Sequence, residues 1–126
     1  MFNGKPLILV VEDQALIRMG AVDLVVFLGY EALEAQGADQ AIRILESRTD
    51  IDLVFTDVEV PGTMDGIMLS HRIRTRWPRI GLIVASGRAV FEADCLPPGS
   101  LFFSKPYSVQ AITEAMALML SDARRW

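Results

Sequence analysis

Polar side chains follow four of the apolar segments of this chain, at the point where each segment ends. They are Glu12 and Asp13, Asp57, Ser86, and Lys105. An ionised carboxylate at the end of a buried strand is costly unless a neighbouring group uses or neutralises it. Asp57 directly follows three apolar residues and a threonine at 53–56 and is therefore the first candidate for chemistry.

Short apolar segments alternate with helical patterns along the chain. Apolar runs of this length between turn residues are typical of strands. We expect strands at 7–11, 30–35, 53–57, 81–85 and 101–104, and helices at 14–28, 39–48, between Asp65 and Trp77, and at 108–120. The alternation predicts an α/β fold with a five-stranded parallel sheet and helices on both faces. The carboxyl ends of parallel strands lie at one edge, where the polar groups can converge.

Composition limits the class of protein. A length of 126 residues suits a single domain spanning 1–126, and 52% hydrophobic residues provide a core. A net charge of −4 argues against a nucleic-acid surface. We ascribe the arginines at 72, 74, 76 and 79 to a solvated helix face, and expect His71 to be exposed and without a role. One cysteine and no apolar run of membrane-spanning length favour a cytoplasmic protein with no membrane contact.

The convergent groups are those that phosphoryl transfer needs. Neighbouring carboxylates repel unless they share a cation, and oxygen ligands of this kind suit Mg²⁺. A lysine and a hydroxyl can bind phosphate oxygens. The set predicts a phosphoryl-transfer site with Asp57 as the nucleophile. A simpler interpretation of Glu12 and Asp13 is a cap for the helix that follows, and both roles can coexist.

The ordered set resembles the response-regulator receiver (CheY-like) domain over nearly the whole chain. The matching pieces are Val11-Glu12-Asp13, Asp57 with Pro61 and Met64-Asp65-Gly66 downstream, Ser86-Gly87, and Lys105-Pro106-Tyr107. The resemblance implies a doubly wound sheet of strand order 2-1-3-4-5. It also implies a role in two-component or phosphorelay signalling, with a sensor histidine kinase or histidine phosphotransfer protein as phosphodonor and a further protein as downstream partner.

The resemblance also implies a role for each matching residue. Asp57 would accept the phosphoryl group. Mg²⁺ would be held by Asp13 and Asp57 directly, with Glu12 beside them and the backbone carbonyl of Glu59 as a further ligand. Lys105, in a cis Lys105-Pro106 peptide, would contact the phosphoryl group, and Ser86 would move toward it. Phe102 would be the switch aromatic, unless it is simply a core residue.

Two parts of the chain depart from the family pattern. One extra residue separates Pro61 from Met64, and Val60 replaces the usual methionine, so we expect a reshaped loop. Glu59 and Arg88 are expected to form an ion pair that slows dephosphorylation. The segment after Gly87 is short, so the fourth helix, expected within 88–95, should be reduced or irregular. Because a reduced fourth helix makes dimerisation through it doubtful, we expect a monomer or weak dimer.

The first helix carries a second apolar line beside its core stripe. The line comprises Ala15, Met19, Val22 and Val26, and is either excess core or, together with Pro106, a face that docks the phosphodonor. We expect a stand-alone receiver without a DNA-binding output domain, not an enzyme beyond its own phosphorylation and dephosphorylation. The alternative is a pseudo-receiver that binds partners independently of phosphorylation. An aspartyl phosphatase is disfavoured, because its Asp-x-Asp motif is missing.

Overall fold

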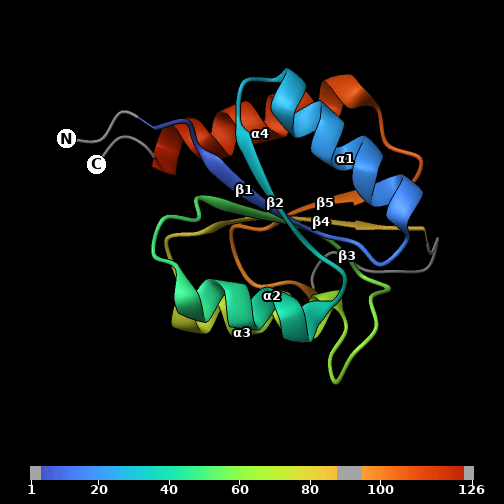
Figure 1. Cartoon of the computed structure of the whole chain (residues 1–126), viewed down its shortest axis with the longest axis vertical. Helices are drawn as coiled ribbons and strands as arrows, with labels where there is room; N and C mark the ends of the chain where they lie inside the picture. The colour runs from blue at the N-terminus through green and yellow to red at the C-terminus, as the bar shows by residue number, and fades with distance from the viewer. Residues whose placement is uncertain (1–3, 88–94, 124–126) are drawn as a thin grey trace.

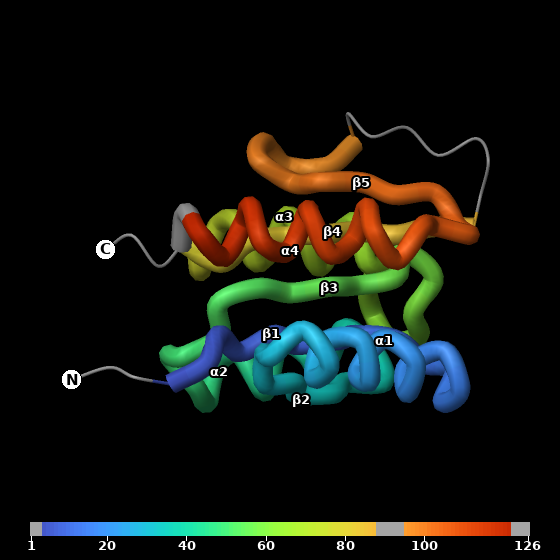
Figure 2. Tube along the Cα trace, turned by 90° about the horizontal axis from the view of Figure 1, so that it is seen from above, coloured from blue at the N-terminus to red at the C-terminus, as the bar shows by residue number. Residues whose placement is uncertain are grey.

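Five parallel strands form one sheet, and helices cover both of its faces. The structure is a computed structural model that describes residues 4–87 and 95–123. The strands are β1 (Leu7–Val11), β2 (Glu31–Ala35), β3 (Leu53–Asp57), β4 (Gly81–Ser86) and β5 (Leu101–Ser104). The helices are α1 (Ala15–Phe27), α2 (Ala38–Ser47), α3 (Gly66–Arg76) and α4 (Val109–Ala123). The strand order is β2-β1-β3-β4-β5, which confirms the expected fold and can be followed from below upward in Figure 2.

The alternation of side chains along the buried strands divides the core in two. In β1, Leu7, Leu9 and Val11 pack toward α2 and α3, whereas Ile8 and Val10 pack toward α1 and α4. Figure 1 shows these helix pairs on opposite sides of the sheet. Successive residues of a strand point to opposite faces, so a strand covered on both sides must be apolar throughout. All five residues of β1 are accordingly buried.

Side chains cap the starts of α3 and α4. The Asp65 side chain accepts a hydrogen bond of 2.9 Å from the Met68 N–H at the start of α3. The Ser108 hydroxyl accepts one of 2.9 Å from the Ala111 N–H at the start of α4. Each cap satisfies an N–H that lacks a partner within its own helix.

The connection between β4 and β5 is attached to α3. Its described part, Cys95 to Ser100, contains no α-helix, and the short helix expected within 88–95 falls mainly on residues outside the described ranges. His71 Nε2 lies 2.6 Å from the Cys95 carbonyl oxygen, and Arg74 Nε donates to the Pro98 carbonyl at 3.2 Å. His71 is exposed as expected, and it nevertheless contacts this connection.

Arg74 departs from the interpretation of the arginine cluster as a solvated face, whereas Arg72, Arg76 and Arg79 are exposed as expected. Its Nη1 donates to the carbonyls of Pro78 and Ile80, both at 3.0 Å, so the guanidinium ties the end of α3 to the start of β4. Arg76 forms an ion pair of 2.8 Å with Glu46 and lies over the Trp77 ring. Of the described helices, none is both long and apolar enough to cross a membrane.

Candidate phosphoryl-transfer site

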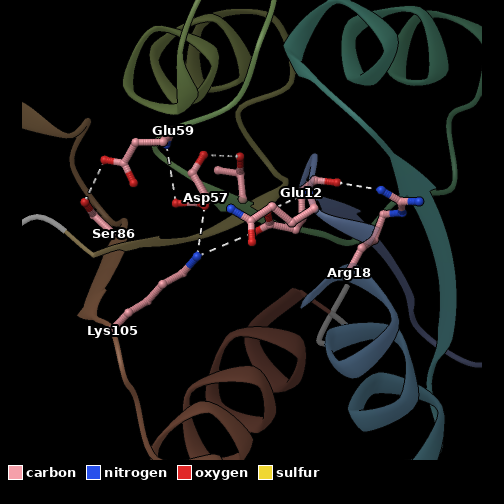
Figure 3. Close-up of polar contacts among 8 residues, drawn as sticks. Glu12, Arg18, Asp57, Glu59, Ser86 and Lys105 are labelled. Atoms are coloured by element: carbon pink, nitrogen blue, oxygen red, sulfur yellow. Dashed lines mark hydrogen bonds and ion pairs between the residues drawn. The ribbon is translucent and has the colours of Figure 1, made fainter. Parts of the chain in front are cut away.

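Two buried carboxylates and one lysine meet at the carboxyl edge of the sheet. Lys105 Nζ lies 2.9 Å from Asp57 Oδ2 and 3.4 Å from Glu12 Oε1. Asp57 and Glu12 are 8% and 5% exposed, so their charges are poorly solvated. Figure 3 shows the lysine reaching across the ends of the strands to both carboxylates. One ammonium thus faces two carboxylates in a region with little water.

Burial and neighbouring charges shift the titration of the groups around this lysine. Burial raises the pKa of the Glu12 carboxyl, and the nearby Asp57 adds to the rise, while the Gln14 N–H and Lys105 oppose it. Burial would lower the pKa of Lys105, but its hydrogen bond with Asp57 and the charges of both carboxylates outweigh this and raise it. The lysine therefore remains an ammonium, and a second cation would relieve the repulsion between the carboxylates.

The sheet itself places Asp57 and Lys105. Asp57 pairs with Ala85 of β4, and the Val58 N–H donates to the Ala85 carbonyl at 2.9 Å. The Lys105 N–H donates to the Ser86 carbonyl at 2.8 Å and extends the pairing of β4 with β5 by one residue. Lys105-Pro106 is cis, as the resemblance implies.

Gly66 lets α3 approach the phosphoacceptor candidate closely. Its N–H donates to the Val58 carbonyl at 2.8 Å. A Cβ at this position would overlap the Asp57 carbonyl oxygen and lie 2.8 Å from Val58 Cα. Both are backbone atoms that cannot move aside without shifting Asp57, so the site requires glycine here.

The start of α1 holds Glu12 in place. Its Oε2 accepts a hydrogen bond of 3.1 Å from the N–H of Gln14, the residue before α1, but no side chain of the described residues caps the first turn of the helix, so the capping interpretation is wrong. Arg18 donates to the Glu12 carbonyl and to Glu34 Oε1, both at 2.9 Å. We did not identify Arg18 from the sequence; the available signal was an arginine within an otherwise apolar helix.

The oxygen groups at this edge fit a magnesium ion held partly by water. Asp13 is exposed directly after Glu12. Within residues 4–87 and 95–123, no group of three or more His, Cys, Asp or Glu side chains is gathered as a metal site. Mg²⁺ typically uses one or two carboxylates and completes its octahedron with waters and phosphate. The donor set is therefore compatible with Mg²⁺ but provides no complete protein cage.

Ser86 and Glu59 lie beside Asp57. The wholly buried Ser86 donates its hydroxyl hydrogen to Glu59 Oε2 at 3.1 Å, and the Glu59 N–H lies 3.4 Å from Asp57 Oδ1. Phe102 is half-buried against a small cluster of Val58, Val84 and Leu96. Arg88, the expected partner of Glu59, is outside the described residues.

The loop with the extra residue is held against the start of α2. Asp39 accepts hydrogen bonds from the Thr63 N–H at 3.2 Å and the Thr63 hydroxyl at 2.8 Å. Gly62 has φ of +120°, a value that side chains rarely adopt. A Cβ on Gly37 would lie 2.7 Å from the Pro61 carbonyl oxygen. The loop therefore depends on Gly37, Gly62 and the Asp39 carboxylate. We did not predict this link between the three residues from the sequence.

Apolar side chains cover the outer surface of α1. Met19 and Val26, both in the expected docking line, are 59% and 58% exposed, and Ala15 is exposed too. Val22 is half-buried and packs on the core between the sheet and α1, so it is not part of the outer surface. Leu16 and Phe27, which are 74% and 85% exposed, belong to this surface instead.

Known proteins resemble this chain in sequence and in fold. The family model of the response regulator receiver domain matches residues 8–117. The chain is 34% identical to sensor kinase CckA of Brucella abortus (94% of this chain, 13% of the kinase) and 32% identical to sporulation initiation phosphotransferase F of Bacillus subtilis (92% and 93%). A signal receiver domain of an HD domain-containing protein from Pseudomonas fluorescens Pf-5 superposes with a TM-score of 0.86 at 29% identity. The match covers 98% of this chain and 92% of that domain.

The chain belongs to the response regulator receiver domain family. Receivers of this kind act in two-component signalling, which implies kinase or phosphotransfer partners, and they are generally phosphorylated and Mg²⁺-dependent. The chain spans less than two thirds of the length of the first relatives that it matches.

Proposed function

We propose that Asp57 accepts a phosphoryl group from a phosphohistidine of a sensor kinase or histidine phosphotransfer protein. The position of Lys105 Nζ between Asp57 Oδ2 and Glu12 Oε1 is the observation that carries this proposal. The ammonium is held at a buried carboxylate, where charge on an incoming phosphoryl group would need a counter-charge.

A carboxylate oxygen of Asp57 would attack the phosphorus of the donor. A bond then forms between this oxygen and phosphorus as the bond from phosphorus to the imidazole nitrogen breaks, and the imidazole leaves with the electron pair. Lys105 would stabilise the charge on the equatorial oxygens, and the Ser86 hydroxyl would offer a further hydrogen bond. Mg²⁺, held by Asp13, Asp57 and the Glu59 carbonyl near Glu12, would neutralise the phosphoryl oxygens when bound.

The outer surface of α1 would receive the donor protein. Leu16, Met19, Val26 and Phe27 are exposed along it. A hollow of about 380 Å³ lies between α1 and the end of β5, lined by Ile17, Lys105, Pro106 and Tyr107. It brings Lys105 together with Pro106, the expected docking residue at the end of β5, so a donor helix seated there would lie beside the ammonium that contacts Asp57.

Phosphorylation by a small phosphodonor tests the acceptor. We expect acetyl phosphate with Mg²⁺ to add one phosphoryl group to the wild type by intact mass, and to add none to Asp57→Ala or when EDTA removes the metal. A label that persists in Asp57→Ala would contradict the assignment of Asp57. A wild type that takes no label would favour a pseudo-receiver whose partners bind independently of phosphorylation.

A further inference from the structure

Glu59 contacts both the phosphoacceptor candidate and the hydroxyl beside it. Its backbone N–H lies 3.4 Å from Asp57 Oδ1, and its carboxylate accepts the hydrogen of the Ser86 hydroxyl at 3.1 Å. In Figure 3 the glutamate reaches from the segment after Asp57 across to the end of β4. Ser86 thus donates its hydroxyl hydrogen to the residue that follows the acceptor by two positions.

Neighbouring strands bring these groups together. Asp57 pairs with Ala85, and Ser86 is the next residue of β4. Ser86 is wholly buried, and Glu59 is half-buried at the mouth of the site. A hydroxyl has one hydrogen to donate, and its bond to an ionised carboxylate is stronger than a bond to a neutral acceptor.

We propose that the Glu59 carboxylate competes with a phosphoryl group on Asp57 for the hydrogen of Ser86. This inference rests on the proposed function. The single hydrogen can be donated to Glu59 or to a phosphoryl oxygen, but not to both. Glu59 is therefore a positioning residue that favours the unphosphorylated arrangement of Ser86 and lowers the fraction of protein phosphorylated at a given donor concentration.

Charge alone would also make Glu59 unfavourable to a phosphoryl group, because like charges repel. Two substitutions separate the effects. Glu59→Gln removes the charge but keeps a side-chain oxygen that can accept from Ser86, whereas Glu59→Ala removes both. Competition predicts more phosphorylation in Glu59→Ala than in Glu59→Gln, and charge alone predicts the same gain in both.

The test measures the steady-state phosphorylated fraction with acetyl phosphate and Mg²⁺, together with the rates at which the label is gained and lost. We expect Glu59→Ala to raise the steady-state ratio of phosphorylated to free protein by about two- to tenfold over Glu59→Gln, the range of one hydrogen bond. In a Ser86→Ala background this difference between the two variants should disappear. Equal values for both variants with Ser86 present would overturn the inference.

The hydrogen bond can be tested without phosphate or metal. A double-mutant cycle of Glu59→Ala and Ser86→Ala in urea unfolding should show coupling, and additive effects would overturn the inference. If the wild type takes no label, the proposed function fails and the inference fails with it. If the wild type is labelled but Glu59→Ala and Glu59→Gln match, only the inference fails.

Discussion

Lys105 Nζ lies 2.9 Å from Asp57 Oδ2, although 48 residues separate them in the chain. The same ammonium lies 3.4 Å from Glu12, which is 93 residues away. The lysine comes from the end of β5 and the carboxylates from the ends of β1 and β3, so the three meet only when the sheet is complete.

Removing the Lys105 ammonium should slow phosphorylation. We expect Lys105→Ala to lower the rate of labelling by acetyl phosphate by about 10²-fold, the typical loss when one preorganised electrostatic donor is removed. Lys5, the other lysine of the chain, is exposed and provides the control Lys5→Ala, which should label as the wild type does. Labelling of Lys105→Ala at the wild-type rate would show that the ammonium does not act on the phosphoryl group.

Adding one methyl group at Gly66 should destabilise the fold. Gly66→Ala places a Cβ against the backbone of Asp57 and Val58, and we expect a loss of about 1–3 kcal/mol in the free energy of unfolding. Gly20→Ala, in α1, is the matched control, because a Cβ there meets nothing within 4 Å. It should stabilise by about 0.8–1 kcal/mol through helix propensity. Urea unfolding of both variants measures the contrast, and similar values would contradict the close approach at Gly66.

A charge on the outer surface of α1 should block the donor protein alone. Met19→Glu is expected to reduce phosphotransfer from a phosphohistidine protein, because the buried charge opposes docking. Labelling by acetyl phosphate should be unchanged, since Met19 is not among the residues that line the pocket at Asp57 and Lys105. Leu118→Glu on α4, at a similarly exposed position, is the control. Equal losses with both phosphodonors would indicate a folding defect.

The contact between Asp39 and Thr63 should make stability depend on pH. The hydrogen bonds from the Thr63 hydroxyl and N–H lower the pKa of Asp39 below that of an ordinary aspartate. A group with a lowered pKa in the folded state stabilises the fold above its unfolded pKa and loses this effect as the pH falls through the folded value. The difference in Tm between wild type and Asp39→Ala should therefore shrink as the solution is acidified from neutral pH. A constant difference would show that the ionised carboxylate is not what holds the loop.

Much of the fold could be predicted from the sequence because strands and helix caps are local signals. The run 7–11 is apolar throughout, and it forms a strand covered on both faces. Asp65 and Ser108 cap the helices that follow them, as their positions in the chain predict. The predicted limits of α1 differ from the observed ones by only one residue at each end.

The side-chain partners could not be predicted in the same way, because they depend on distances across the fold. The bond of Ser86 to Glu59, the bridge of Arg18 from Glu12 to Glu34 and the attachment of Cys95 to His71 all join separate elements. Val22 and Leu16 are both apolar residues of one helix, and only the packing of α1 on the sheet decides which of them is exposed.

The sequence by itself determined that acidic, hydroxyl and basic groups stand at strand ends, because hydrophobic periodicity and turn residues act over a few neighbours. The tertiary structure alone decided which oxygen each group contacts. A shift of an ångström in strand register or helix packing makes or breaks a hydrogen bond, and no local pattern encodes that distance.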